Sequence, residues 1–346
     1  MKKNGFLLIN LGTPASPSTA DVRAYLNEFL MDPYVIDTPW PVRRALVSLF
    51  ILPFRPRRSA EAYASIWDPE TGSPLLHHCQ QLTQALSEIL PGPAALAMRY
   101  GEPSIAAGVA QLKAQQIDEL IVIPLYPQYA DSTITTSIEA VRNCVGDTPM
   151  QVLAPYYDAP EFINSLAADI RPFLHSGENQ QTGDAPTASH LLLSYHGLPE
   201  RHLQRTDPTG SHCLASEDCC QRSSPAHATC YRHQVFATSK ALATQLGLSP
   251  DQYTVSFQSR LGRLPWLQPF TDQVLAELPG RGIKNLAVAC PAFVADNLET
   301  LEEIGMQGYE TFTAAGGEHL QLIPCLNSTP TWVRGLADII ERGHTL

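Results

Sequence analysis

The sequence predicts an α/β protein made of two similar halves, each built around a parallel β-sheet. Short apolar runs recur along the whole chain, stretches with helical periodicity lie between many of them, and parts of the first half recur in the second. Strands that alternate with helices are typical of parallel sheets built from β-α-β units. With 346 residues, the chain is long enough for two domains that each bury a core.

Eight short apolar runs are predicted to be buried strands. They are Phe6–Asn10, Leu96–Tyr100, Leu120–Leu125, Val152–Pro155, Leu191–Tyr195, Tyr253–Phe257, Leu286–Cys290 and Leu320–Pro324. Between them, helical spacing is clearest at Leu82, Leu86 and Ile89 and at Val274 and Leu278. Each half therefore has four predicted strands.

The predicted domain boundary lies at the turn-rich segment Gly177–Thr187, which gives lobes of residues 1–176 and 177–346. The C-terminal helix is predicted to pack back on the first lobe. Segment 117–122 matches segment 283–288 at a constant offset of 166 residues, and both are followed by a Pro-x-aromatic step. Two such lobes facing each other would form a cleft lined by strand ends.

Composition and charge exclude several classes of protein. A net charge of −11, from 23 basic and 34 acidic residues, argues against nucleic acid as a partner. Apolar runs are too short to span a bilayer, and the N-terminal residues lack a signal-peptide pattern. We therefore expect a cytoplasmic protein.

His196 is the leading candidate for a catalytic residue. It lies in Ser194–Pro199, directly after the apolar run Leu191–Leu193, and so at the carboxyl end of a predicted strand, where open α/β sheets bind ligands. A neutral imidazole accepts protons or binds metal near physiological pH. The alternative is a buried histidine that is hydrogen-bonded to a neighbour.

Acidic residues follow the strand Leu286–Cys290. Either Asp296 or Asn297 can cap the helix that begins there, and Glu299 can close a capping box. If the helix start faces the cleft, Glu299 instead presents a carboxylate opposite His196. Such a pair suits proton transfer or a partial metal site.

A third cluster follows the strand that ends near Leu125. Segment 124–137 contains Tyr126 among other aromatic and hydroxyl side chains, which suit a flat ligand with polar edges. The alternative is a Pro-rich turn followed by a Ser/Thr helix cap.

Four segments together resemble ferrochelatases: 194–199, 291–303, 256–267 and 125–132. They occur in the family's order, and the resemblance extends from Leu8 to about Ala337. It implies insertion of Fe²⁺ into protoporphyrin IX to give protohaem, the terminal step of haem biosynthesis. It also implies two Rossmann-like lobes of a chelatase-like fold, with the porphyrin between them. The alternatives are a coproporphyrin III ferrochelatase, a cobalt chelatase, and a non-catalytic porphyrin or haem carrier; no oligomeric state is predicted.

By this resemblance, His196 accepts a pyrrole proton or coordinates iron, Glu299 is its acidic partner, and Asp296 supports proton exit or metal delivery. Asn297 stands where many relatives have a histidine. That difference argues against a mechanism with a second imidazole.

The resemblance also implies a set of porphyrin contacts. They are Leu11, Tyr63, Ser73, Arg99, Tyr100, Tyr126 and Trp266. Tyr63 and Ser73 correspond to contacts with a propionate, Arg99 and Tyr100 to an Arg-Tyr wall, and Trp266 to a tryptophan beside the ring. The alternative for Tyr63 and Trp266 is core packing.

Segment 40–58 is predicted to form a porphyrin lip that makes peripheral contact with the inner face of the membrane. Its apolar run lies between Arg43 and Arg44 on one side and Arg55, Arg57 and Arg58 on the other. The alternative is a core helix with a solvated basic end.

Four cysteines lie close together in a predicted insertion at 205–230: Cys213, Cys219, Cys220 and Cys230. Four thiolates can hold zinc or a [2Fe-2S] cluster, and the spacing does not choose between them. Resemblance to bacterial ferrochelatases with a four-cysteine insertion favours [2Fe-2S], whereas His212, His227 and His233 keep a zinc or mixed-ligand site open. The cysteines at 79, 144, 290 and 325 are predicted to be packed thiols.

Overall fold

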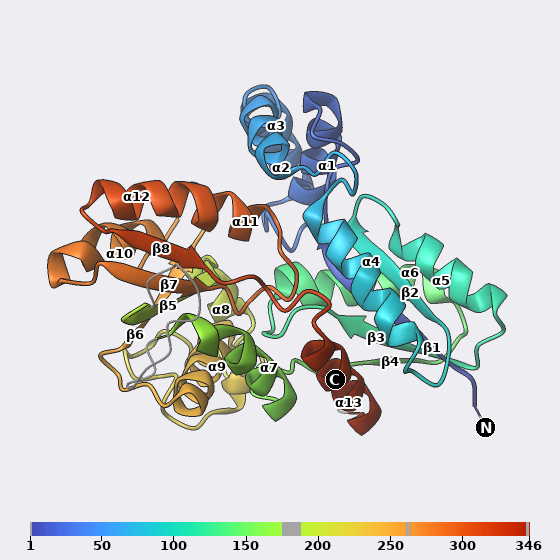
Figure 1. Ribbon diagram of the computed structural model, residues 1–346. Coiled ribbons are helices and arrows are strands. Elements are labelled where there is room, and N and C mark those ends of the chain that lie inside the picture. Colours follow the sequence, from blue (N-terminus) through green and yellow to red (C-terminus); the bar gives the residue numbers. More distant parts are fainter. Residues whose placement is uncertain (1, 175–187, 261, 263, 344–345) are drawn as a thin grey trace. The chain divides into compact units, whose positions relative to one another are not determined.

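The computed structural model describes residues 2–174, 188–260, 262, 264–343 and 346. The chain forms two compact units, each with one sheet (Figure 1). The first unit comprises Met1–Tyr126, Ala130–Pro155 and Asn327–Leu346, and the second comprises Pro127–Tyr129 and Tyr156–Leu326. The predicted boundary after residue 176 lies outside the described residues.

The first unit has a parallel sheet of four strands in the order β2-β1-β3-β4. The strands are β1 (Asn4–Gly12), β2 (Ala94–Tyr100), β3 (Glu119–Pro124) and β4 (Met150–Val152). In the central strand β1, Leu8 pairs with Leu96 on one side and Ile123 on the other. Leu7, Leu8 and Ile9 are fully buried. Burial of both faces explains why this strand is an unbroken apolar run.

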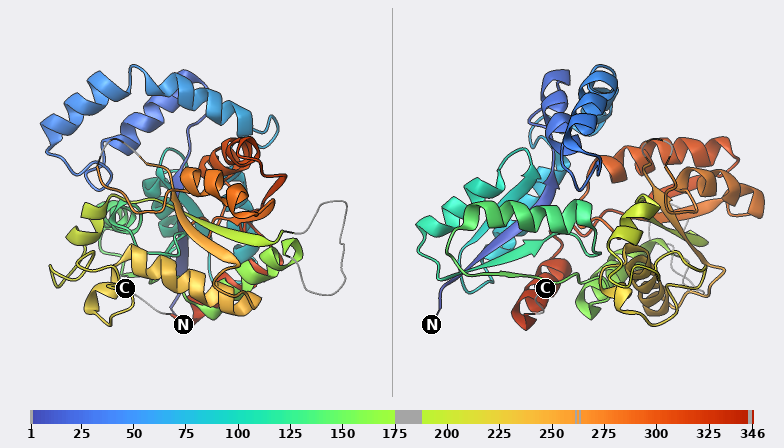
Figure 2. Two further views of the ribbon diagram at one scale, coloured as in Figure 1. Left: turned by 90° about the vertical axis from the view of Figure 1, so that its left-hand side faces the viewer. Right: turned by 180° about the vertical axis from the view of Figure 1, so that it is seen from behind.

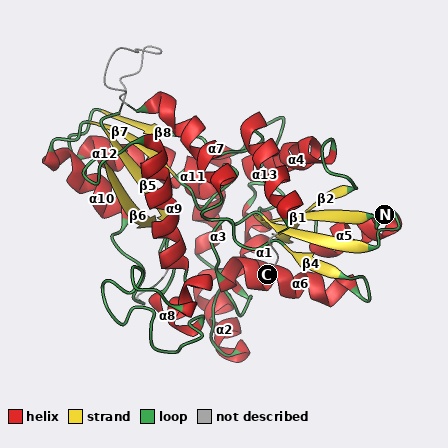
Figure 3. Cartoon of the chain, turned by 90° about the horizontal axis from the view of Figure 1, so that it is seen from below, coloured by secondary structure: helices red, strands yellow, loops and turns green. Residues whose placement is uncertain are grey.

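The first unit has helices on both faces of its sheet and beyond one end of it. Its helices are α1 (Thr19–Leu30), α2 (Trp40–Leu46), a π-helical turn (Val47–Ile51), α3 (Arg55–Ile66), α4 (Pro74–Ser87), α5 (Ile105–Ala114), a second π-helical turn (Asp131–Thr135), α6 (Thr136–Val145) and α13 (Pro330–Arg342). α4 and α13 lie on one face, and α5 and α6 lie on the other (Figure 3). Ser18 and Ser104 cap α1 and α5, since each side chain accepts a backbone N–H of the first turn.

The second unit repeats this topology with the strand order β6-β5-β7-β8, again all parallel. Its strands are β5 (His190–His196), β6 (Tyr253–Gln258), β7 (Asn285–Ala289) and β8 (His319–Leu322). Leu191, Leu192 and Leu193 of the central strand β5 are fully buried. In both units the first strand of the sheet lies between the second and the third, so the two halves are alike, as the sequence repeat indicates.

The helices of the second unit also lie on both faces. They are α7 (Pro160–Ile170), α8 (Glu200–Arg205), α9 (Tyr231–Leu246), α10 (Thr271–Glu277), α11 (Leu298–Leu301), a π-helical turn (Glu303–Gly308) and α12 (Tyr309–Ala314), with 3₁₀ turns at Arg171–Phe173, Pro225–Ala228 and Leu278–Arg281. α7 packs against α9, and α10 packs against α12 (Figure 2). Because Phe162 and Leu166 of α7 are buried in this unit, residues 156–170 belong to it although they precede the predicted boundary.

All eight predicted strands are present, but β4 is displaced toward the N-terminus. It spans Met150–Val152 instead of Val152–Pro155. β4 is an edge strand whose first residues are partly or fully exposed, so an apolar run marks only its buried end. The helix predicted through Ile89 ends at Ser87, and Ile89 lies exposed in the following turn.

Candidate active site

His196 is the last residue of β5, at the carboxyl end of the central strand of the second sheet. The residues before it are buried, whereas the imidazole is partly exposed. Its Nδ1 lies 2.6 Å from the carbonyl oxygen of Gly197. Because a carbonyl only accepts hydrogen bonds, Nδ1 carries the proton of the neutral ring. Nε2 is then the atom that can accept a proton or bind a metal.

The backbone around His196 is held at two points. The hydroxyl of Tyr231 donates to the carbonyl oxygen of His196 at 2.8 Å, and the Gly197 N–H donates to the carbonyl oxygen of Gln258 at 2.6 Å. A Cβ atom at Gly197 would lie 2.9 Å from that same oxygen and 3.1 Å from the carbonyl oxygen of Ser259. Only glycine therefore allows this close approach of two strand ends.

Asn297, and not Asp296 or Glu299, builds the cap of α11. Its Oδ1 accepts the N–H groups of Glu299 and Thr300, and Thr300 completes the capping box. Asp296 is buried, and its Oδ1 accepts the N–H of Cys325 at 3.1 Å and the Thr300 hydroxyl at 3.2 Å. With the cap formed by Asn297, the Glu299 carboxylate is not used in capping.

Gln258 connects the strand ends to α11. It is the register partner of His196 in β6. Its Nε2 donates to the backbone oxygen of Glu299 at 2.6 Å, and its Oε1 accepts from Ser194 at 2.8 Å. Glu299 is partly exposed. Sequence reasoning assigned no role to Gln258, because the predicted strand stopped one residue before it.

Trp266 lies beside the same strand end. It forms a β-bridge with Pro199, and a Cβ at Gly197 would be 3.4 Å from its indole ring. The rings of Phe293 and His196 form a T-shaped pair, with their centroids 6.3 Å apart. The second unit thus has an imidazole and aromatic rings at the carboxyl edge of its sheet, and Gln258 connects this edge to the backbone of Glu299.

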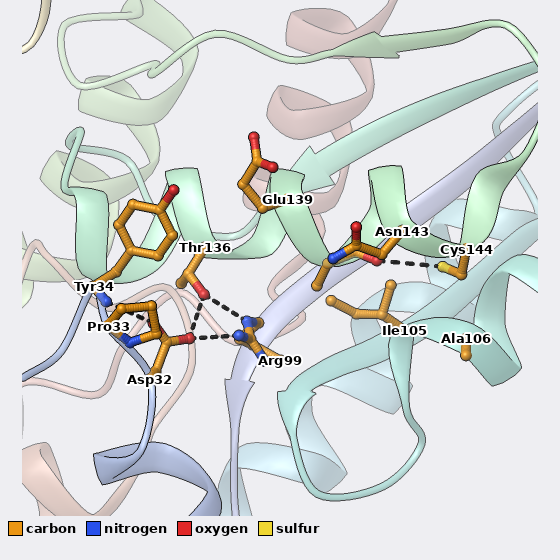
Figure 4. Close-up of a pocket in the computed structure, with 11 residues that line it drawn as sticks. Asp32, Pro33, Tyr34, Arg99, Ile105, Ala106, Thr136, Glu139, Asn143 and Cys144 are labelled. Atoms are coloured by element: carbon orange, nitrogen blue, oxygen red, sulfur yellow. Dashed lines mark hydrogen bonds and ion pairs between the residues drawn. The ribbon is translucent and has the colours of Figure 1, made fainter. Parts of the chain in front are cut away.

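Arg99 and Tyr100 end β2 in the first unit and share the buried carboxylate of Asp32. Arg99 forms an ion pair with Asp32 and donates from Nε to Thr136 at 2.7 Å (Figure 4). Tyr100 is only 1% exposed and donates to Asp32 at 2.9 Å, and its burial together with the Asp32 charge raises its pKa. Arg99, Asp32 and Thr136 line a pocket of about 510 Å³. No sequence motif pointed to Asp32.

The other predicted porphyrin contacts of the first unit lie on separate elements. Tyr63 of α3 and Ser73, which precedes α4, are buried. Tyr126 follows β3 and is also buried, whereas Leu11 near the end of β1 is partly exposed. Tyr63 packs edge-on against Trp67. Their contacts with a porphyrin remain predictions.

The predicted lip comprises α2, the π-helical turn after it and the start of α3, beyond the carboxyl end of β1 (Figures 1 and 2). Its most exposed apolar side chains are Trp40 (62%), Leu49 (64%), Phe50 (69%) and Phe54 (75%). Among its arginines, Arg43 differs from expectation. It is buried and donates to the carbonyl oxygens of Ile36 and Thr38, so it does not contribute to a basic surface. No helix within the described ranges is long and apolar enough to cross a membrane.

The four clustered cysteines lie between α8 and the start of α9. The sulfur atoms of Cys219 and Cys220 are 3.9 Å apart. Hydrogen bonds from the thiols of Cys220 and Cys213 and from the His233 N–H lower the pKa of Cys230 to about 6. The structure thus brings all four thiols together, because Cys219 lies beside Cys220, and Cys230 contacts both Cys220 and Cys213.

Polar groups surround this cysteine loop. Nη1 of Arg232 lies 3.6 Å from the sulfur atoms of both Cys219 and Cys220. Ring nitrogens of His212 and His227 contact the carbonyl oxygen of Cys219. His233 contacts that of Cys220 in the same way. In the described part of the chain, no group of three or more His, Cys, Asp or Glu side chains has the arrangement of a site for a metal ion.

Comparisons with known proteins decide the family. The sequence model of the family described as Ferrochelatase matches residues 3–344. The ferrochelatase of Stutzerimonas stutzeri (strain A1501) is 51% identical over 348 residues, which cover 99% of this chain and 98% of that protein. This chain belongs to the ferrochelatase family. The ferrochelatase of Pseudomonas fluorescens (strain Pf0-1) is 53% identical, with the same coverage of both chains. As a family member at this identity over its full length, the chain is a metal chelatase.

Solved structures confirm the chelatase-like fold of this ferrochelatase family member. SirB from Bacillus subtilis with Fe³⁺ matches 99% of this chain and 96% of that chain, with a TM-score of 0.53 and 10% identity. The sirohydrochlorin chelatase SirB from Bacillus subtilis subspecies spizizenii in complex with cobalt has a TM-score of 0.51, again at 10% identity. At this identity the likeness shows the fold alone.

Proposed function

We propose that this chain inserts Fe²⁺ into protoporphyrin IX to form protohaem. The observation that carries the proposal is the Nδ1 contact of His196, which leaves Nε2 as the accepting atom at the end of β5, in a member of the ferrochelatase family whose Asp296 and Glu299 follow the neighbouring strand β7. The reaction removes two protons from pyrrole nitrogens as the macrocycle takes up one Fe²⁺. Its chemistry therefore needs a base beside the ring and a path for protons.

His196 supplies the base in this proposal. The Gly197 carbonyl fixes the ring so that Nε2 is the accepting atom, and the pinned backbone limits where that atom lies. Glu299 takes the proton onward or receives iron as the metal substrate. Asp296 is more deeply buried and supports the following step of proton or metal transfer.

Asn297 restricts the mechanism to one imidazole at this position. Its Oδ1 caps α11 and its Nδ2 donates to the carbonyl oxygen of Ala295 at 3.0 Å. Both polar atoms of the Asn297 side chain therefore form hydrogen bonds with the backbone. The proton relay runs from His196 to carboxylates only.

A metallation assay tests the function. Anaerobic incubation with Fe²⁺, Zn²⁺ or Co²⁺, each with protoporphyrin IX or coproporphyrin III, should give the highest kcat/KM for Fe²⁺ with protoporphyrin IX. A higher kcat/KM with coproporphyrin III, or with Co²⁺, would replace this proposal by the corresponding alternative. Metallation no faster than the enzyme-free background would leave only a carrier.

The four cysteines are proposed to hold a [2Fe-2S] cluster. Such a cluster takes two protein ligands on each iron, and pairs of neighbouring thiols fit that need. When bound, the cluster would cross-link this loop.

Replacement of Cys219 by serine is expected to remove the sulfide-to-iron absorption bands and the acid-labile sulfide of fresh protein. Cys144→Ser is the matched control, because Cys144 is a half-buried thiol outside the loop and should leave both signals unchanged. Wild-type protein that contains zinc and no labile sulfide would contradict the cluster.

The protein is proposed to be cytoplasmic, with the lip resting on the anionic inner face of the membrane. Its exposed aromatic and aliphatic side chains, with the exposed Arg44, Arg57 and Arg58, form an apolar surface with basic flanks. A core helix would bury these side chains, so their exposure argues against that alternative.

The triple variant Leu49→Ser, Phe50→Ser and Phe54→Ser should reduce co-sedimentation with anionic liposomes at least several-fold, because it removes apolar area that enters the interface. Ile89→Ser with Met306→Ser is the control, since both are exposed apolar side chains outside the lip. Equal liposome binding by the triple variant and wild type would refute membrane contact through this segment.

A further inference from the structure

Tyr231 joins the cysteine loop to the backbone of His196. It directly follows Cys230 and is the first residue of α9. Its side chain is 6% exposed, and its hydroxyl donates to the His196 carbonyl oxygen at 2.8 Å, across 35 residues of sequence. Burial raises the pKa of this hydroxyl, so it remains a neutral donor.

The loop end of this connection is firmly anchored. Cys230 is buried, and Thr229 beside it donates to the carbonyl oxygen of Thr206 at 2.7 Å. In the first turn of α9, the side-chain amide of Gln234 donates to the carbonyl oxygens of His227 and Ala228. The cysteine loop therefore fixes the start of α9, and with it the position of the Tyr231 hydroxyl.

The histidine end has few ways to move. Two hydrogen bonds hold the His196–Gly197 peptide, because its N–H donates to Gln258 and its carbonyl accepts from Tyr231. The imidazole is held by the Gly197 carbonyl. The Tyr231 hydrogen bond is the contact that orients the carbonyl of His196 itself. Its loss would leave this peptide held through its N–H alone, so that the carbonyl can tilt about that one hydrogen bond and shift Nε2.

We propose that Tyr231 is a positioning residue that couples the cysteine loop to the placement of the His196 imidazole. This inference rests on the proposed chelatase function and on the proposed cluster. A cross-link through the four thiols would add to the hydrogen bonds of Thr229 and Gln234 that hold the start of α9, and without it the Tyr231 hydroxyl is held less tightly. Loss of the cross-link then changes the position of the His196 imidazole through the hydrogen bond of the Tyr231 hydroxyl.

The first test compares Tyr231→Phe with Tyr195→Phe. Tyr195 is the matched control, because it is also buried, precedes His196 in β5 and loses a 2.8 Å hydrogen bond to Ser239 instead. We expect Tyr231→Phe to lower kcat about ten-fold, with the KM for porphyrin and the labile sulfide content within two-fold of wild type. We expect Tyr195→Phe to keep kcat within two-fold. Unchanged kcat in Tyr231→Phe, or equal losses in both variants, would overturn the positioning role.

A double-mutant cycle tests the coupling to the loop. Cys219→Ser should lower kcat in the wild-type background and have little further effect in the Tyr231→Phe background, because both changes release the same contact. Additive losses in the double variant would overturn the coupling.

The NMR signal of the His196 imidazole separates this inference from the proposed function. Identified by its absence in His196→Ala, the signal should shift in Tyr231→Phe and not in Tyr195→Phe, whether or not the protein metallates porphyrin. An unshifted signal in Tyr231→Phe would refute the positioning role even in an active chelatase.

Discussion

His196→Ala is expected to lower the rate of protoporphyrin metallation at least about 100-fold, the range typical of a lost general base. The substitution removes the Nε2 atom that accepts the pyrrole proton or receives iron. It leaves the Tyr231 and Gln258 contacts intact, because both are made to the backbone of residues 196 and 197. Porphyrin affinity, measured by quenching of porphyrin fluorescence, should stay within a few-fold of wild type.

The matched control for this variant is His319→Ala. His319 is a partly exposed histidine at the first residue of β8, the opposite end of its strand from the site. Its loss should leave kcat unchanged. If His196→Ala retained more than half of the wild-type kcat, His196 would be neither base nor metal ligand.

Gly197→Ala is expected to lower kcat by about 100-fold, the loss that misplacement by about 1 Å can cause. A methyl group there would lie 2.9 Å from the carbonyl oxygen of Gln258, which is backbone and cannot swing away. The ends of β5 and β6 must separate, and the imidazole moves with them. Circular dichroism should show that the variant remains folded while the metallation assay shows the loss.

Gly280→Ala provides the comparison for this glycine. A Cβ at Gly280 meets no atom within 4 Å, so the same chemical change should have no measurable effect on kcat. Full activity in Gly197→Ala would show that the close approach of the two strand ends does not position His196.

The two central strands were predictable because their burial leaves an unmistakable pattern. β1 and β5 are covered on both faces, so Leu7–Ile9 and Leu191–Leu193 are continuous apolar runs. The edge strand β4 has exposed residues at its start, and there the pattern indicates the wrong bounds. The carboxyl end of β5 could be predicted because the strand is buried up to Tyr195. The sequence alone therefore places His196 at the edge of the sheet.

Residues that act through long-range contacts were not predictable. Gln258 reaches Glu299 across 41 residues, Tyr231 reaches His196 across 35, and Asp32 reaches Arg99 across 67. None of these pairs leaves a local spacing that identifies it. The four cysteines are different, since they lie in one short loop and their proximity is visible in the sequence. Their neighbour Arg232 became evident only from its distances to two sulfur atoms.

A single-turnover experiment tests the central claim most directly. Protein loaded with protoporphyrin IX is mixed anaerobically with Fe²⁺, and porphyrin fluorescence and an indicator dye report metallation and proton release together. The account predicts that the wild type forms protohaem with two protons released for each porphyrin consumed, and that His196→Ala binds the porphyrin but does neither. Equal rates of protohaem formation by wild type and His196→Ala would contradict it.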